Sequence, residues 1–179
     1  MKILVTGGAG FIGSFIVDEL VKKGHFVRIF DSLDPQVHPQ GKEPEWLNKN
    51  AEFIKGDVRD YDSFKKALEG IEVVFHHAAA VGVGQSQYQI KHYIDVNTGG
   101  TANLMDIIIN HKNSVKKIIV AASMSSYGEG SYKCNKHGTV RPNPRPEERM
   151  KEGKWEQICP ICQEEVTPVP TKETDRMII

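Results

Sequence analysis

The sequence predicts an α/β fold in which helices cover both faces of a doubly wound parallel sheet. Two observations support this prediction. Short apolar, β-branched segments alternate with amphipathic helical segments over the first 122 residues. A glycine-rich turn also joins the first apolar segment to the first helical segment. This alternation brings the carboxyl ends of the strands, where ligands bind in such folds, to one edge of the sheet.

The first part of the pattern is a strand, a turn, a helix and a second strand. Residues 2–6 (KILVT) form a short apolar run that ends at glycine, which predicts a buried strand. Residues 15–21 place their apolar side chains on one helical face, and residues 22–24 (KKG) are typical of a helix end. Residues 25–30 (HFVRIF) predict the second strand, which is followed by Asp31.

The turn GGAGFIG at residues 7–13 is typical of nucleotide binding. Glycines lack a Cβ atom, so backbone N–H groups can approach a pyrophosphate at the positive end of the helix. Asp31 lies 18 residues after Gly13, close to the offset of about 20 residues at which an acid contacts an adenosine ribose. A carboxylate there would repel a 2′-phosphate, which favours NAD over NADP. An ordinary tight turn is the alternative, but the strand, the helix and the acid together favour nucleotide binding.

The alternation continues beyond residue 50. Further strands are predicted at 51–55, 71–76 and 117–122, and further helices at 61–68, with Asp60 as the N-cap, and at 90–110. The polar, proline-containing region 35–49 predicts a surface loop, and residues 81–86 predict a flexible loop. His76 and His77 end a strand with no acid or cysteine beside them, so a structural role is favoured over metal binding.

The overall composition excludes several classes of function. The chain has 179 residues, and its 23 Lys and Arg balance 23 Asp and Glu, so nothing indicates nucleic acid or an anionic membrane as a partner. No apolar run approaches the roughly 18 residues of a transmembrane helix. The N-terminus MKILVTGG lacks the features of a signal peptide. We therefore expect a cytoplasmic protein.

The segment SYKCNKHG at residues 131–138 has two incompatible interpretations. Tyr132 and Lys136 have the Tyr-x-x-x-Lys spacing of a proton-transfer pair, which needs both side chains on one helix face. Cys134 and His137 have the spacing of half a zinc knuckle. The absence of apolar helical periodicity around this segment disfavours the catalytic pair.

The metal interpretation has a second half further along the chain. Cys134 and His137 are followed, after 21 residues, by Cys159 and Cys162 of the motif CPIC. The two halves together include all three cysteines of the chain. Four such ligands suit a closed tetrahedral zinc site. The extended, proline-rich stretch 141–146 and the predicted polar helix 147–157 contain too little apolar material to fold alone, so metal binding would stabilise them. Free structural cysteines and a redox role for CPIC are the alternatives.

Several segments together resemble one family. They are TGGAGFIGS, the strand ending in FD, GDVRD, VFHHAAAVGVGQS, VNTGGTANLMD and VAASMSSYGEG, and they occur in this order. The chain resembles the N-terminal portion of an extended short-chain dehydrogenase/reductase of the nucleotide-sugar epimerase/dehydratase group, and is most similar to dTDP-L-rhamnose 4-epimerase-like and UDP-glucose 4-epimerase-like proteins. Some relatives are similar in having a Cys-rich insertion here.

The resemblance implies a Rossmann-type NAD-binding domain at 1–128, a Cys/His-rich insertion at 129–170 and the start of a further part at 171–179. It implies NAD pyrophosphate contacts from Gly7, Gly10, Phe11, Ile12 and Gly13, adenosine contacts from Asp31, Ser32, Asp57 and Val58, and nicotinamide contacts from Ala78, Ala79 and Ala80, with Asn97 behind them. It implies a catalytic role for Ser123, and sugar contacts from Val83, Ser123 and Ser125. For Asn97 and Ser125, structural hydrogen bonding is the alternative.

The family's chemistry implies three protein groups. A tyrosine phenolate removes a proton from a sugar hydroxyl as hydride passes to NAD, a lysine lowers the pKa of the tyrosine, and a serine orients both. In 4-epimerases the keto sugar rotates and receives the hydride on its opposite face, which regenerates NAD. Residues 166–174 resemble the segment that leads to the Tyr-x-x-x-Lys helix, but no such pair follows.

We therefore expect an incomplete enzyme that acts on a nucleotide sugar. The chain would be a fragment, the product of an interrupted gene, or a subunit completed by a C-terminal polypeptide. A homodimer through the helix at 90–110 is a further expectation. The alternatives are a dehydratase or reductase of the same family, and a non-catalytic NAD-binding module.

Overall fold

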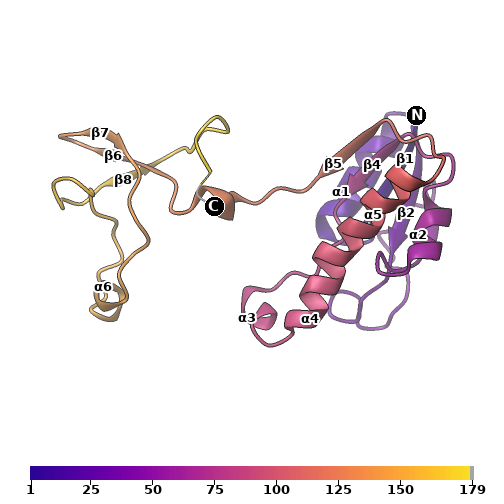
Figure 1. Ribbon diagram of the computed structural model, residues 1–179, viewed down its shortest axis with the longest axis horizontal. Helices are drawn as coiled ribbons and strands as arrows, with labels where there is room; N and C mark the ends of the chain where they lie inside the picture. The colour runs from indigo at the N-terminus through magenta and orange to yellow at the C-terminus, as the bar shows by residue number, and fades with distance from the viewer. Residues whose placement is uncertain (178–179) are drawn as a thin grey trace. The chain divides into compact units, whose positions relative to one another are not determined.

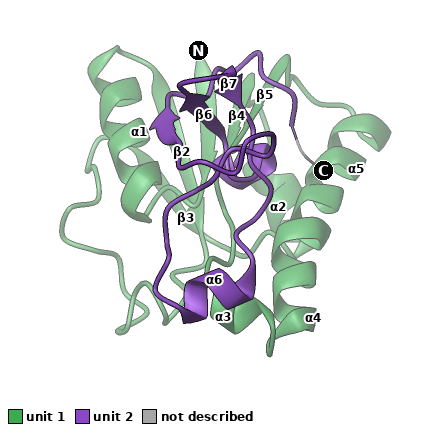
Figure 2. Cartoon of the chain, turned by 90° about the vertical axis from the view of Figure 1, so that its left-hand side faces the viewer, with its two compact units in different colours: residues 1–121 green, residues 122–179 purple. Residues whose placement is uncertain are grey.

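The computed structural model describes residues 1–177 and divides the chain into two compact units. Unit 1 comprises residues 1–121 and unit 2 begins at residue 122; the two are coloured green and purple in Figure 2. The functional boundaries expected at 128 and 170 stay predictions.

The centre of unit 1 is a five-stranded parallel sheet with the strand order β3-β2-β1-β4-β5. The strands are β1 (Lys2–Thr6), β2 (Phe26–Asp31), β3 (Glu52–Lys55), β4 (Val73–His76) and β5 (Lys117–Val120). In the register of the sheet, Thr6 is the partner of both Phe30 and His76. The carboxyl ends of the three central strands therefore lie side by side, as the predicted doubly wound fold requires.

Helices cover both faces of this sheet (Figure 1). α1 (Phe11–Lys22) packs on one face, and α2 (Tyr61–Ala67) and α5 (Gly100–Asn110) pack on the other. The short helices α3 (Val83–Ser86) and α4 (Ile90–Tyr93) precede α5 and contain no buried residue. The alternation of side chains along β1 directs Ile3 and Val5 into a core with Val17 of α1. The side chain of Leu4 points the other way, into a second core with Phe64 of α2.

Two details of unit 1 differ from the sequence prediction. A flexible loop was expected at 81–86, but residues 83–86 form the helix α3. A 3.0 Å hydrogen bond from Ser86 N to Gly82 O closes its first turn. The predicted helix at 90–110 is interrupted by the π-helical segment η1 (Ile94–Gly99) between α4 and α5. The predicted N-cap of α2 is confirmed, because the Asp60 carboxylate accepts a hydrogen bond from Ser63 N.

Unit 2 is built on a small antiparallel sheet with the strand order β7-β6-β8. Its elements are the 3₁₀ helix η2 (Met124–Tyr127), β6 (Ser131–Cys134), β7 (Gly138–Val140), α6 (Glu147–Lys151) and β8 (Thr167–Val169). The helix predicted at 147–157 is shorter than expected because Gly153, with φ +74°, closes it by donating to Met150 O. The small core of this unit contains Tyr132, Cys134, Val140, Cys159 and Val166.

Among the described residues, no helix combines the length and the apolar character needed to cross a membrane.

Candidate functional site

The glycine-rich turn between β1 and α1 is packed so closely that side chains do not fit. A Cβ atom at Gly7, where φ is +68°, would lie 2.9 Å from the backbone N of Ala78 at the end of β4. A Cβ atom at Gly13 would lie 2.1 Å from Gly7 O. Only glycine tolerates both the positive φ and these contacts. The turn therefore presents bare backbone at the start of α1, where the first N–H groups of a helix have no intrahelical partners.

The predicted pyrophosphate residues lie together at this start. Phe11 and Ile12 open α1 with 80% and 63% of their surfaces exposed, which is unusual for large apolar side chains. Gly13 and Val17 are buried on the opposite side of the same helix. The first turn of α1 thus combines a buried glycine face with an accessible backbone edge.

Asp31 ends β2 and joins two neighbouring loops. Its side chain is 9% exposed. One carboxylate oxygen accepts a 3.0 Å hydrogen bond from Ala9 N in the glycine-rich turn, and the other accepts a 2.9 Å hydrogen bond from Leu33 N. Each oxygen keeps capacity for a further donor, such as a ribose hydroxyl. The neighbouring Ser32 is exposed.

Thr6, which is not among the residues predicted from the sequence, organises the turn that follows β4. Its Oγ1 accepts 3.1 Å hydrogen bonds from the backbone N–H groups of His77 and Ala78, and it lies 2.9 Å from His76 Nδ1. The other ring nitrogen of His76 lies 3.2 Å from Thr101 Oγ1. A hydroxyl at the end of a buried strand, directly before the glycines, is the sequence signal that could have identified it.

The ring of His76 has structural partners, in line with the favoured interpretation. Burial lowers the pKa of His76 to about 4, and neighbouring His77 adds to the effect. The ring is therefore neutral near pH 7, so its two nitrogens can serve one as a donor and one as an acceptor to Thr6 and Thr101.

Asn97 holds the end of the Ala78–Ala80 segment in place. Its Oδ1 accepts a 2.8 Å hydrogen bond from Ala80 N, and its Nδ2 donates a 3.1 Å hydrogen bond to Ala80 O. Asn97 belongs to the π-helical segment η1, and such segments are frequent at functional sites. Together, Thr6 and Asn97 hold both ends of the three-alanine segment through side-chain hydrogen bonds.

Asp57 and Val58 follow β3 with different environments. Hydrogen bonds from Arg59 lower the pKa of Asp57, although partial burial acts in the opposite direction. Val58 is buried, and a Cβ atom at Gly100 would lie 2.5 Å from its Cγ2. Gly100 therefore allows the start of α5 to approach this loop closely.

The residues predicted to face the sugar occur in both units. Val83 begins α3 in unit 1 and is 84% exposed. Ser123 belongs to unit 2, where its Oγ accepts a 3.2 Å hydrogen bond from Ser125 N and caps η2. Ser123 and Ser125 are both exposed.

The predicted metal ligands of unit 2 converge on one point. The ligand atoms of Cys134, His137, Cys159 and Cys162 all lie within 4.8 Å of one another. His137 Nδ1 lies 3.6 Å from the sulfurs of both Cys134 and Cys159, and the sulfurs of Cys134 and Cys162 are 3.7 Å apart. Zinc bond lengths in a regular tetrahedron place sulfur and nitrogen ligands about 3.6 Å apart and two sulfurs about 3.8 Å apart.

Two turns position these ligands. The first is the β6–β7 turn, in which Cys134 pairs with Gly138 across the hairpin. The second is the CPIC turn, in which Ile161 N lies 3.4 Å from Cys159 Sγ and Gln163 N donates to Cys159 O. Each turn thus directs backbone N–H groups toward the ligand region.

The electrostatics of the cluster lower the pKa of Cys134 and Cys159 and raise that of Cys162. Burial alone would raise the pKa of Cys134, but hydrogen bonds from the backbone N–H groups of Lys136 and His137, and from the ring of His137, lower it to about 6. Hydrogen bonds to Cys134 and Cys159 raise the pKa of His137. Thiolate is the form of cysteine that binds metal.

Tyr132 and Lys136 do not share a helix. Tyr132 lies on β6 with its side chain buried beside the cysteines, whereas Lys136 is in the following turn and pairs with Glu164. The sequence-based preference for the metal interpretation of this segment over a catalytic pair agrees with this arrangement.

Comparison with known proteins places the chain in a family. Residues 3–148 match the model of the NAD dependent epimerase/dehydratase family. The chain is 33% identical over 176 residues to a dTDP-L-rhamnose 4-epimerase of Burkholderia thailandensis, in a match that covers 95% of this chain and 48% of that protein.

Solved structures of 4-epimerases are also similar to this chain. A UDP-glucose 4-epimerase of Thermotoga maritima with UDP-glucose matches 83% of this chain and 43% of its own chain, at 35% identity and a TM-score of 0.64. A UDP-glucose 4-epimerase of Brucella ovis in complex with NAD matches 73% of this chain and 38% of its own, at 29% identity and a TM-score of 0.62. This chain therefore spans about half the length of the relatives that it matches, or less. It belongs to the NAD dependent epimerase/dehydratase family.

Proposed function

We propose that this chain forms the NAD-binding part of a nucleotide-sugar 4-epimerase-like enzyme. The main support for this proposal is that the ends of β1, β2 and β4 meet at a turn whose backbone is not covered by side chains. The glycine-rich turn packs against Ala78 at the end of β4, and Asp31 at the end of β2 holds the same turn through Ala9 N. This arrangement suits a dinucleotide that lies across the sheet edge.

The residues of unit 1 fit the parts of NAD in order. The backbone at Gly10, Phe11 and Ile12 would bind the pyrophosphate, because it lies at the positive end of α1. Asp31 would accept hydrogen bonds from the ribose hydroxyls of the adenosine half. The Ala78–Ala80 segment has small side chains and would leave room for the nicotinamide half.

The remaining predicted contacts complete this assignment. Gly7 and Gly13 would allow the close approach of the pyrophosphate, Ser32 and Val58 would flank the adenosine, and Asp57 would lie beside the adenine. Asn97 would act through Ala80, since it hydrogen-bonds both backbone groups of that residue.

The chemistry that bound NAD would supply is reversible hydride transfer at C4 of the sugar. Ser123 would orient the reacting sugar hydroxyl, with Val83 and Ser125 as further sugar contacts. A proton acceptor for the hydroxyl is also required, and the family resemblance assigns that role to a tyrosine of a Tyr-x-x-x-Lys pair.

Calorimetric titration of the chain with NAD tests the cofactor assignment. We expect Asp31→Asn to weaken NAD binding at least about tenfold, because a charge-assisted hydrogen bond to each ribose hydroxyl is lost. The same variant should bind NADP relatively better, because the repulsion of the 2′-phosphate is removed.

Asp62→Ala is the matched control, since Asp62 is an exposed carboxylate on α2. Equal NAD affinity of the wild type and Asp31→Asn would remove Asp31 from the site. Absence of NAD binding to the folded wild-type chain would refute the proposal as a whole.

We also propose that unit 2 binds one structural zinc ion through Cys134, His137, Cys159 and Cys162. The spacing of the sulfur and nitrogen atoms supports this proposal, since it matches the edges of a zinc tetrahedron. Four protein ligands close the coordination sphere, which favours a structural over a catalytic ion.

Elemental analysis of the purified chain tests the zinc assignment. We expect one equivalent of zinc, and its loss in Cys159→Ser and His137→Ala. Asn135→Ala is the matched control because Asn135 is exposed in the same turn. Metal-free protein in which unit 2 keeps its protected amides would contradict the assignment.

A further inference from the structure

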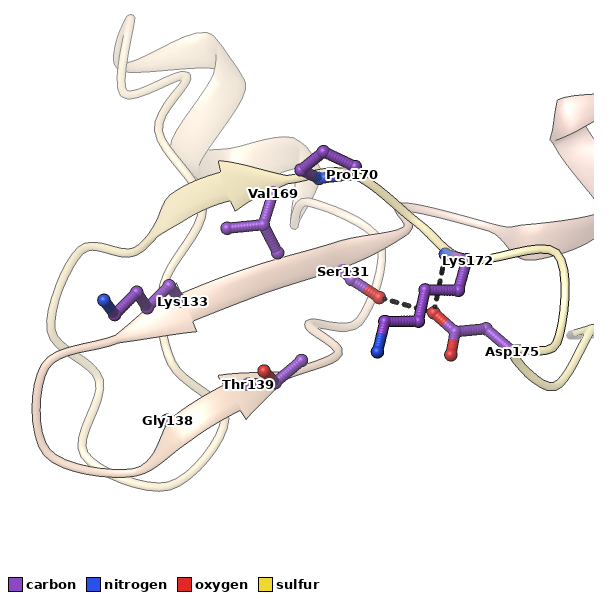
Figure 3. Close-up of a pocket in the computed structure, with 8 residues that line it drawn as sticks. All are labelled: Ser131, Lys133, Gly138, Thr139, Val169, Pro170, Lys172 and Asp175. Atoms are coloured by element: carbon purple, nitrogen blue, oxygen red, sulfur yellow. Dashed lines mark hydrogen bonds between the residues drawn. The ribbon is translucent and has the colours of Figure 1, made fainter.

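Unit 2 contains a cavity on the face of its sheet that points away from the cysteines. The cavity has a volume of about 510 Å³, within the roughly 300–1,000 Å³ of small-molecule sites. Figure 3 shows the residues that line it. They are Ser131, Lys133, Gly138, Thr139, Val169, Pro170, Lys172 and Asp175.

The strand register explains why this face is polar. Lys133 on β6 is the partner of Thr139 on β7, so both side chains are on the same face. The intervening neighbours Tyr132 and Cys134 point to the opposite face and pack in the small core. The sheet therefore separates the Cys/His cluster from a face that carries hydroxyl and ammonium groups.

The two lysines of the cavity differ from the other lysines of unit 2. Lys136, Lys151 and Lys154 each form an ion pair with a glutamate. Within residues 122–177, no ion pair is formed by Lys133 or Lys172, and both line the cavity. Among the lysines of residues 122–177, the two without an ion pair thus both line this cavity.

The only carboxylate in the cavity lining is already neutralised. Asp175 accepts hydrogen bonds from Ser131 Oγ and Lys172 N, both at 3.1 Å, and it pairs with Arg141 at 3.0 Å. These contacts also anchor the segment after β8 to β6. Lys172 is therefore attached to a fixed backbone, and Asp175 does not cancel the charges of the lysines.

We propose that this cavity binds a small molecule through a diphosphate group. Lys133 enters it from β6 and Lys172 from the segment that follows β8, and Figure 3 shows them at opposite ends of the lining. Each ammonium group can therefore pair with a different phosphate of a diphosphate. Thr139 supplies a hydroxyl on the same face. Ammonium groups and hydroxyls are common phosphate ligands.

Calorimetric titration of the full chain with inorganic pyrophosphate tests this proposal. Any binding of the probe at the glycine-rich turn of unit 1 is the same in all variants, so the lysine changes report on the cavity alone. We expect saturable binding that weakens with salt, and at least about tenfold weaker binding in the variant with Lys133→Gln and Lys172→Gln. Both lysines are exposed, so these changes leave folding intact.

Two comparisons make the result specific. Lys151→Gln is the matched control, because it removes an exposed lysine outside the cavity, and it should bind pyrophosphate like the wild type. UDP as a second probe separates two sources of the diphosphate: tighter binding than pyrophosphate identifies a nucleotide ligand, and equal binding identifies recognition of the diphosphate alone. Unchanged binding in the double-lysine variant, or preference for inorganic phosphate over pyrophosphate, would overturn the proposal.

Discussion

The two units of this chain have cores of different kinds. Unit 1 buries two apolar clusters of 10 and 9 residues on the two faces of its sheet. Unit 2 buries a single cluster of five residues, two of which are the candidate ligands Cys134 and Cys159. A segment of this size cannot bury enough apolar surface to offset its conformational entropy, so small domains commonly depend on metals or disulfides. The comparison indicates that hydrophobic burial stabilises unit 1, whereas the metal coordination that we propose would stabilise unit 2.

The largest expected effect is selective unfolding of unit 2 on metal removal. Structural zinc sites contribute about 10–16 kcal/mol of binding free energy that is also folding free energy. A strong chelator should therefore abolish amide protection around β6 and the CPIC turn, and leave protection in β1 and β4 unchanged. Hydrogen exchange read by mass spectrometry resolves the two units. Simultaneous loss of protection in both units would mean that they do not differ in this way.

A substitution that creates a void in the apolar core of unit 1 should destabilise unit 1 and leave unit 2 unchanged. Phe64 is fully buried in unit 1 and stacks on Phe30 with ring centroids 5.2 Å apart. Phe64→Ala should lower the free energy of unfolding of unit 1 by about 3–5 kcal/mol, because the packing is lost and a cavity remains. Urea unfolding measures the change, and zinc content should stay at the wild-type value. Tyr61→Phe, at a partly exposed position on the same helix, is the milder comparison.

Acid should weaken unit 1 through a buried histidine. The pKa of His76 is lowered from 6.5 to about 4 in the folded state, so the unfolded state takes up the proton first as the pH falls. Stability from neutral His76 is therefore complete above pH 6.5 and is lost as the pH falls toward 4, by about 3 kcal/mol at most.

Comparison with His76→Gln isolates this contribution, because glutamine keeps a polar side chain and does not titrate. The variant should show a shallower decline of unfolding free energy between pH 6.5 and pH 4. Parallel pH profiles for the two proteins would exclude His76 as the cause.

The smallest expected effect concerns a helix end in unit 1. Asp60→Ala removes the side-chain acceptor of Ser63 N at the start of α2 and should cost about 1 kcal/mol of unfolding free energy. Asp60→Ser should retain most of the stability, since serine is also a good N-cap. Thermal unfolding of the three proteins gives the order, and protection in unit 2 should not change in any of them.

Local patterns were sufficient to predict most of unit 1. The apolar runs around Leu4, Ile29 and Val74 predicted the buried strands, because each is short, rich in β-branched residues and bounded by turn or polar residues. The π-helical segment around Asn97 was not predictable, since the residues 94–99 continue an ordinary helical pattern and their geometry accompanies the hydrogen bonds to Ala80. The helix α3 was missed because its glycine-rich sequence favours a loop.

The candidate site residues also divide into those that sequence patterns predict and those that they do not. Spacing alone singled out Asp31 as a candidate cofactor contact and the four Cys/His residues as candidate metal ligands, and the structure brings these four together. The position of Thr6 before the glycines marks it as a candidate, but its three hydrogen-bond partners could not be derived from spacing, since they are about 70 positions away.

By itself, the sequence determined the parallel α/β fold, the family and the pairing of two knuckles, because each depends on residues close together in the chain or on fixed intervals. Tertiary structure alone decided which groups share an environment. It placed Lys133 and Lys172 in the lining of one cavity while Asp175 is held by Arg141, and it made Thr6 and Asn97 the supports of the Ala78–Ala80 segment. Such contacts depend on strand register and chain reversal, which bring distant residues together without leaving a local pattern.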